Sequence, residues 1–197
     1  MEKKLQGIKK KVTECTKCEL SATRNNAVPG KGNYKSDVIF VGEAPGKNED
    51  MKGEPFIGVA GNKLSAALES AGISRDEVYI TNIVKCRPPK NRVPTEIERN
   101  TCQNYLKKEI EIIKPEIICI LGNTAFNSLL DGKEITKFRG KIVRKNNQLY
   151  FLTIHPAATI YNQKLISVLK KDIKKLFKLI KKIKEGEKIK IDIEHTS

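Results

Sequence analysis

The segment Val38–Gly61 constrains the fold of this chain more than any other part of the sequence. It opens with an apolar run, Val38–Val41, that Gly42 ends, which is the pattern of a buried strand. The loop after such a strand is where α/β folds build ligand sites. Glu43 stands at the end of the strand, and Phe56 supplies an aromatic surface nearby. The segment predicts an α/β domain with a site for a flat polar ring, although an ordinary strand and turn with a solvated glutamate has the same pattern.

Further strands and helices alternate along a chain whose length predicts one compact domain. Apolar runs at 78–84 and 116–121 predict two more buried strands. A hairpin about Asn146–Asn147 is expected to join Val143 to a last strand, 150–154. Helices are expected at residues 2–12, 61–72, 95–114, 123–130 and 164–184, the last with one apolar and one lysine-rich face, and residues 185–197 are expected to fray.

The chain is strongly basic, with 38 Lys and Arg residues against 23 Asp and Glu, a formal net charge of +15. Such an excess favours a polyanionic partner, with nucleic acid ahead of a membrane surface. A composition adapted to solubility or high temperature is the alternative. No stretch is apolar enough to span a membrane, and the N-terminus does not resemble a signal peptide, so we expect a cytoplasmic monomer.

Four of the five cysteines are spaced as ligands of a metal or an iron–sulfur centre. Cys15 and Cys18 form a C-x-x-C pair whose thiolates can reach one centre, although a redox dithiol has the same spacing. Cys86 and Cys102 flank a second loop and complete a set of four. Cys119 lies inside an apolar strand and is interpreted as a small core residue. In an intracellular chain, metal or cluster ligands are favoured over disulfides.

Polar residues stand near the ends of three predicted strands: Glu43, Asn82 and His155. The carboxyl ends of parallel strands converge on one crevice of a sheet. Asn82 offers a donor and an acceptor side by side, which suits the imide edge of a pyrimidine. His155 can donate to an oxygen on which negative charge develops, and Phe56 can stack on a base. A histidine before a proline is usually structural, so the combination is what favours a functional site.

In these motifs the chain resembles the type-4 uracil-DNA glycosylases, the iron–sulfur branch of the uracil-DNA glycosylase superfamily. The resemblance covers residues 15–179, most of the chain. Glu43 separates the chain from the sister iron–sulfur branch, which has an apolar residue at that place. Besides the four cysteines, the motifs that carry the resemblance are Gly42–Gly46, Glu54–Gly58, Thr81–Pro89 and His155–Ala158.

The resemblance implies a three-layer α/β/α sandwich around a central four-stranded, mostly parallel sheet, in one domain spanning residues 1–197. It also implies a [4Fe–4S] cluster with a structural role, which positions the basic loop Lys85–Arg92 against DNA phosphates. A zinc ion on the same thiolates is the alternative. The implied cluster ligands are Cys15, Cys18, Cys86 and Cys102.

The implied reaction is hydrolysis of the N-glycosidic bond of deoxyuridine in DNA, the first step of base-excision repair, on a base extruded from the duplex. Phe56 would stack on uracil, and Asn82 would read its O4 and N3 edge and reject cytosine. His155 would stabilise the uracil anion, and Glu43 would place water or balance the positive sugar. The residues implied to contact uracil are Gly42, Glu43, Ala44, Phe56, Asn82 and His155.

The sequence departs from the wider superfamily at three places. Ala44 and Gly46 stand where the best-studied branch has a water-orienting Asp and a thymine-excluding Tyr, so both functions are unassigned here. Tyr161 stands where many relatives have an Arg that contacts the DNA backbone. The basic residues expected to contact DNA phosphates are Lys85, Arg87, Lys90, Arg92, Lys137 and Arg139.

Two other classes of protein fit part of the pattern. A non-catalytic iron–sulfur or zinc protein that binds nucleic acid would explain the charge and the cysteines, but it would not need Glu43, Asn82 and His155 together. An electron carrier would explain the cysteines alone.

Overall fold

The computed structural model describes residues 1–195 and has a mixed seven-stranded sheet at its centre. Its four inner strands are all parallel, which confirms the expected parallel core, and three short or edge strands extend that core to seven. The spatial order is β1 (Lys31–Gly32), β3 (Tyr79–Asn82), β2 (Val38–Gly42), β4 (Ile117–Leu121), β6 (Gln148–Thr153), β5 (Ile142–Lys145) and β7 (Ile193–Glu194).

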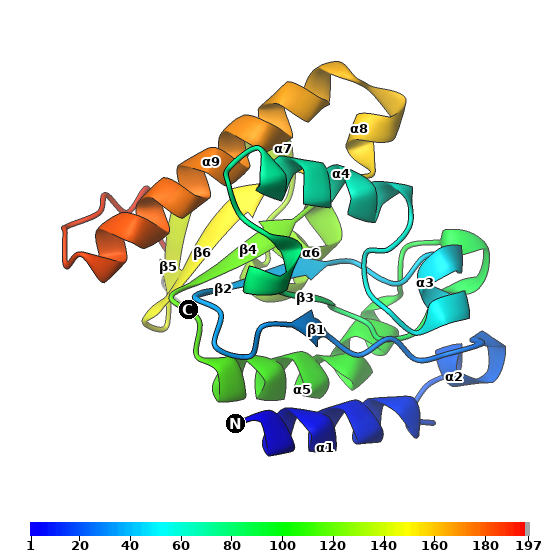
Figure 1. Cartoon of the computed structure of the whole chain (residues 1–197). Helices are drawn as coiled ribbons and strands as arrows, with labels where there is room; N and C mark the ends of the chain where they lie inside the picture. Colours follow the sequence, from blue (N-terminus) through cyan, green and yellow to red (C-terminus); the bar gives the residue numbers. More distant parts are fainter. Residues whose placement is uncertain (196–197) are drawn as a thin grey trace.

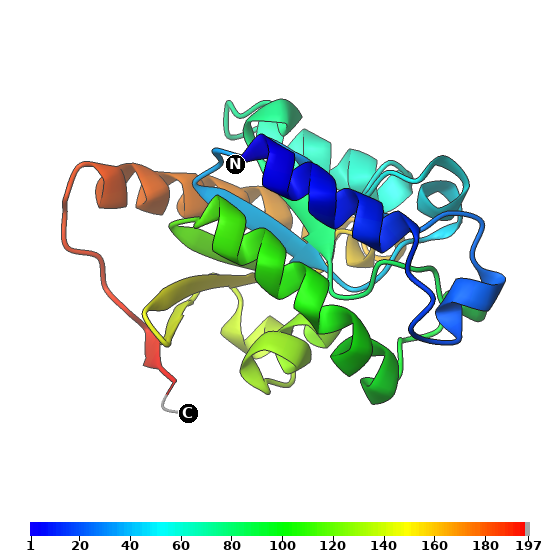
Figure 2. The ribbon, with the colours of Figure 1, turned by 90° about the horizontal axis from the view of Figure 1, so that it is seen from below.

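Helices cover both faces of the sheet, so the expected three-layer sandwich is confirmed (Figure 1). Alternate residues of a strand point to opposite faces, and β2 shows this: Ile39 and Val41 lie in one core, Val38 and Phe40 in the other. Figure 2 shows α1 and α5 side by side across one face, with α4 and α9 behind the sheet. The first layer contains α1 (Glu2–Thr13), α5 (Glu96–Ile113) and α6 (Asn123–Leu130), and the second contains α4 (Val59–Glu69) and α9 (Lys164–Lys184).

Short helices occupy the loops around this sandwich. They are α2 (Leu20–Thr23), α3 (Lys47–Lys52), α7 (Ile135–Phe138), α8 (Ala158–Tyr161) and the 3₁₀ turns η1 (Arg75–Glu77) and η2 (Pro89–Asn91).

Local signals in the sequence account for several boundaries. Thr95 and Glu98 form the expected capping box of α5: Thr95 N donates to Glu98 Oε2 at 2.7 Å, and Glu98 N donates to Thr95 Oγ1 at 3.3 Å. Asn146 and Asn147 both have positive φ, which is the backbone that a two-residue hairpin loop requires. Cys119 is fully buried in β4, as expected of a core residue.

The C-terminal segment differs from its prediction. Residues 185–197 are expected to fray, but Ile193 and Glu194 pair with Val143 and Arg144 of β5. This strand pairs through only two residues, so it needs no long apolar run, and no such run marks it in the sequence. Residues 196–197 lie outside the described part. Within residues 1–195, no helix combines the length and apolar character that crossing a membrane requires.

Candidate active site

The carboxyl ends of β2 and β3 and the loop after β6 enclose a cavity of about 320 Å³. The structure brings Glu43, Phe56, Asn82 and His155 together in its wall, with Ala44 and other loop residues beside them. These elements are adjacent because β2 pairs with β3 on one side and with β4 on the other, and β4 pairs with β6. The cavity is large enough for one planar ring of the size of a pyrimidine.

The Phe56 ring and the Asn82 amide pack closely against Gly42. A Cβ atom at this position would lie 2.4 Å from the ring of Phe56 and 2.6 Å from Asn82 Oδ1. Both distances are far below van der Waals contact, so only glycine allows the two side chains to lie this close to β2. The sequence-predicted residue Gly42 therefore acts by leaving space.

Asn82 is buried at the end of β3, and its Oδ1 has no hydrogen-bond partner among residues 1–195. Leaving a buried amide oxygen unpaired costs about 1–3 kcal/mol, so native proteins rarely do it without a reason. Because Asn82 lines the cavity, a rotation of its amide would let a ligand with an N–H group satisfy this oxygen. The amide is therefore the clearest sign of what the cavity binds.

Phe56 is held in an unusual backbone conformation, with a φ of +52°. Its ring centroid lies 5.7 Å from that of His155, with 34° between the planes. Glu49, which was not predicted, fixes this loop: one carboxylate oxygen accepts from Ile57 N at 3.0 Å and Gly58 N at 2.7 Å, and the other from Gly46 N at 3.1 Å. The spacing of an acid three residues after Gly46, as in a capping box, is the signal that could have identified Glu49.

His155 is a neutral imidazole with its proton on Nε2. Burial lowers the pKa of His155 to about 4, and the carboxylate of Glu49 opposes this shift only in part. The backbone N–H of Ala157 donates to His155 Nδ1 at 3.1 Å, so Nδ1 is the acceptor of the ring. The remaining N–H is therefore available as a donor to a group in the cavity.

Glu43 is oriented by a residue that the sequence did not single out. Thr124, in the first turn of α6, donates its hydroxyl to Glu43 Oε2 in a short hydrogen bond. Asn91 is a second unpredicted residue in the cavity wall. Both lie on elements whose packing against the strand ends is set by tertiary structure, so no local pattern marks them.

The four predicted cluster ligands line one small cavity between α1, α5 and the loop after β3. The Arg24 guanidinium donates to Cys86 Sγ at 2.9 Å, and Lys85 N donates to Cys102 Sγ at 3.3 Å. Such N–H···S hydrogen bonds favour thiolates that ligate iron. None of the four cysteines forms a disulfide; they are Cys15, Cys18, Cys86 and Cys102.

Burial raises the pKa of Cys102 to about 12, and burial also raises the pKa of Cys86, against the opposing effect of Arg24. Without a bound centre these thiols hold their protons, so binding of a metal centre would release them. Within residues 1–195, no group of three or more His, Cys, Asp or Glu side chains is arranged to hold a metal ion. The four thiols are the donor set of a [4Fe–4S] cluster, which is larger than a single ion, and the hydrogen bonds to sulfur support that fit.

The prediction that Lys85 contacts DNA phosphates is wrong. Its side chain is 1% exposed, and its ammonium pairs with Glu109 at 2.7 Å, so it cannot reach a ligand at the surface. Arg139 is also engaged, because its guanidinium forms two hydrogen bonds with the buried carboxylate of Asp172. A basic loop in the sequence does not show which of its cations point inward.

The other basic candidates are exposed or partly exposed. Arg92 lines the mouth of the active-site cavity while its guanidinium pairs with Glu98. Lys90 is exposed beside it, and Arg87 donates to the side chain of Asn91. Lys137 is exposed on α7, where it pairs with Glu134. The loop Arg87–Arg92 is thus the basic surface next to the cavity.

The comparisons with known proteins agree with this geometry. Residues 29–181 match the model of the uracil DNA glycosylase superfamily. The chain belongs to this superfamily. Within it, the chain is 46% identical over 179 residues to a type-4 uracil-DNA glycosylase of Saccharolobus solfataricus, covering 86% of this chain and 83% of that protein. Type-4 enzymes of Sulfurisphaera tokodaii and Archaeoglobus fulgidus are 45% and 43% identical, over 89% of this chain and 84% and 92% of theirs.

Proposed function

We propose that this member of the uracil-DNA glycosylase superfamily releases uracil from DNA by hydrolysing the N-glycosyl bond of deoxyuridine, as the first step of base-excision repair. The observation that carries the proposal is the buried, unpaired Oδ1 of Asn82 in a cavity that also contains Phe56 and a neutral His155. A base inside a duplex cannot reach such a cavity, so the nucleotide must leave the stack.

Recognition depends on the Asn82 amide. Uracil has an N–H at N3 and a carbonyl oxygen at C4, so it donates to Oδ1 and accepts from Nδ2. Cytosine has an acceptor at N3 and an amino group at C4, which places acceptor against acceptor and donor against donor. Phe56 stacks on the ring, Gly42 leaves the space that lets Phe56 and Asn82 lie close together, and Ala44 lies beside the base.

Bond cleavage sends the electron pair of the C1′–N1 bond to uracil, which leaves as an anion. The Nε2–H of His155 donates to the O2 oxygen of that anion. The sugar becomes positively charged, and the carboxylate of Glu43, held by Thr124, balances that charge or orients the water that attacks C1′. The water oxygen bonds to C1′ and its proton passes to solvent, while the uracil anion takes a proton from solvent, so the products are neutral uracil and an abasic sugar.

The four cysteines that line the cavity between α1 and α5 hold a [4Fe–4S] cluster in this proposal, with zinc as the alternative. When bound, the cluster links the segment after α1 to the loop after β3 and to α5. That link holds the loop Arg87–Arg92 beside the active site, where its exposed cations contact DNA phosphates. Free cysteines and iron–sulfur chemistry suit a cytoplasmic protein, and we expect it to act as a monomer.

The test is release of free uracil from a synthetic strand that contains one deoxyuridine, with a strand that contains only thymine as the control. Release from the first strand alone supports the proposal. His155→Ala should reduce the rate about 10²- to 10³-fold, the typical cost of removing one donor to a developing anion. No release by protein with an intact metal centre would instead favour a non-catalytic nucleic-acid-binding protein.

Asn82→Asp tests whether Asn82 recognises the base. This change replaces the amide donor by a second acceptor, so excision of uracil should slow and discrimination against cytosine should weaken. Unchanged rates on both bases would remove Asn82 from the recognition step.

A further inference from the structure

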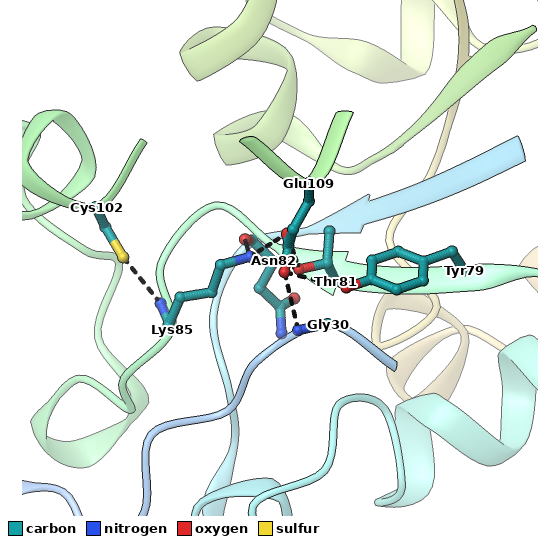
Figure 3. A network of polar contacts seen from close by, with 7 residues as sticks. All are labelled: Gly30, Tyr79, Thr81, Asn82, Lys85, Cys102 and Glu109. Atoms are coloured by element: carbon teal, nitrogen blue, oxygen red, sulfur yellow. Dashed lines mark hydrogen bonds and ion pairs between the residues drawn. The ribbon is translucent and has the colours of Figure 1, made fainter. Parts of the chain in front are cut away.

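A buried ion pair lies directly behind the active site and has no part in the chemistry proposed above. The ammonium of Lys85 and the carboxylate of Glu109 are 2.7 Å apart, and each side chain is 1% exposed. Figure 3 shows the pair between the end of β3 and helix α5. A buried ion pair is seldom retained for stability alone, because an apolar pair of similar volume often serves as well.

Each donor of the Lys85 ammonium has a partner, and two of the three partners belong to the end of β3. Its three donors are directed at Glu109 Oε2, at the hydroxyl of Thr81 and at the backbone oxygen of Asn82, the last at 3.0 Å. Asn82 is the residue that lines the cavity and whose side-chain oxygen is unpaired among residues 1–195. The charge therefore binds the main chain of the residue that reads the base.

Both carboxylate oxygens of Glu109 also have all their hydrogen-bond partners, and this fixes the position of the ammonium. Its Oε1 accepts from Gly30 N at 3.1 Å and from the hydroxyl of Tyr79 at 3.3 Å. Its Oε2 accepts from Thr81 Oγ1 at 2.9 Å as well as from Lys85. Satisfied buried networks of this kind are rigid and define one geometry.

The main chain of Lys85 connects this network to the cysteine site. Its N–H donates to Cys102 Sγ at 3.3 Å, and its carbonyl accepts from Val28 N at 2.6 Å. Figure 3 shows Cys102 and the Glu109 carboxylate on opposite sides of this one residue. Lys85 thus joins the cysteine site to the base-reading end of β3.

We propose that Lys85 and Glu109 are positioning residues for base recognition: the buried ammonium fixes the carbonyl of Asn82 and, through it, the direction of the Asn82 amide in the cavity. The proposal rests on the function proposed above. Displacement of a reacting or recognising group by about 1 Å can cost about 10²-fold in rate, so loss of this support should be measurable.

The decisive protein is the double variant Lys85→Met, Glu109→Gln. It removes both charges at similar volume, and the new amide can still accept from Gly30 N and contact Thr81. We expect the turnover number on a deoxyuridine strand to fall about tenfold or more and the inhibition constant of free uracil to rise by a similar factor, while KM for DNA changes less than about threefold. The visible absorbance of the cluster should be retained.

The same change in an Asn82→Ala background gives the sharpest result. If the pair acts through Asn82, the double variant should cause almost no further loss there, because the two effects are not additive. Equal losses in both backgrounds, or rates within about twofold of the unchanged protein, would overturn the proposal. Release of uracil by the unchanged protein tests the function separately, so the two failures are distinguishable.

Leu176→Ala is the matched control for general destabilisation. Leu176 is fully buried on α9, in the core on the other face of the sheet, so the change lowers stability without touching the network. It should leave the uracil inhibition constant unchanged. Should the double variant not fold, Thr81→Val decides, because it removes one acceptor of Lys85 and one donor to Glu109; an unchanged inhibition constant in that variant overturns the proposal.

Discussion

Asn82 ends strand β3, and Lys85 follows it three residues later; both side chains are buried, but their hydrogen bonding differs. Asn82 keeps a side-chain oxygen without a partner, whereas every donor of the Lys85 ammonium and every oxygen of Glu109 is used. An unpaired buried group is tolerated where a ligand completes it, and a saturated network is suited to holding a neighbour in place. The comparison separates the part of the site that recognises from the part that supports it.

The largest expected effect comes from breaking the saturated network. Lys85→Met leaves the Glu109 carboxylate buried without its cation, and breaking a buried pair in this way costs about 3–5 kcal/mol. The free energy of unfolding in urea measures the loss.

Lys184→Met is the control, because it removes the ion pair between Lys184 and Asp37, both of which are well exposed. That change should cost less than about 1 kcal/mol. Equal losses in the two variants would show that the buried pair has no special role.

Gly42→Ala should disturb the packing of the two side chains that recognise the base. The new methyl group would overlap the Phe56 ring and Asn82 Oδ1, so one or both must move. We expect uracil release to fall about 10²-fold, with a loss of about 1–3 kcal/mol in stability from overpacking. Uracil-release kinetics and thermal unfolding check both numbers, and a variant as fast as the unchanged protein would contradict the packing described for Gly42.

Acid should weaken the fold through His155. Burial keeps its pKa near 4 in the folded protein, below the ordinary value of about 6.5, so only the unfolded chain gains a proton between these pH values. The free energy of unfolding should therefore fall by roughly 2–3 kcal/mol as the pH drops from 6.5 to 4. The same titration on His155→Gln should lack this component; an identical slope would show that His155 is not its source.

The smallest effect is expected on the surface. Lys90→Gln should lower affinity for DNA by about 1 kcal/mol or less and reduce the slope of log affinity against log salt by about 0.7–0.9, the value for one phosphate contact. Lys137→Gln, on α7, gives the comparison. A slope that is unchanged in Lys90→Gln and reduced in Lys137→Gln would move the DNA path away from the loop Arg87–Arg92.

Much of this arrangement follows from local sequence patterns. The apolar runs predicted the inner strands, and the polar residues near their carboxyl ends, Glu43, Asn82 and His155, were expected to meet there, as they do in the cavity wall. Lys85 was misinterpreted because its neighbours in the loop are basic, while its partner is on a helix that begins eleven residues later. Which lysine turns inward depends on the packing of α5 against β3, and no short pattern records that packing.

The pairing of Ile193 with Val143 has a consequence for the behaviour of the whole molecule in concentrated solution. Strand β5 lies beyond the parallel core, and an uncovered edge strand offers unpaired backbone groups to a second copy of the chain. Here Asp192 N donates to Ile142 O, and His195 N donates to Arg144 O, so the chain's own last described residues occupy that edge. The segment covers the edge of β5 and so opposes edge-to-edge pairing with a second copy there.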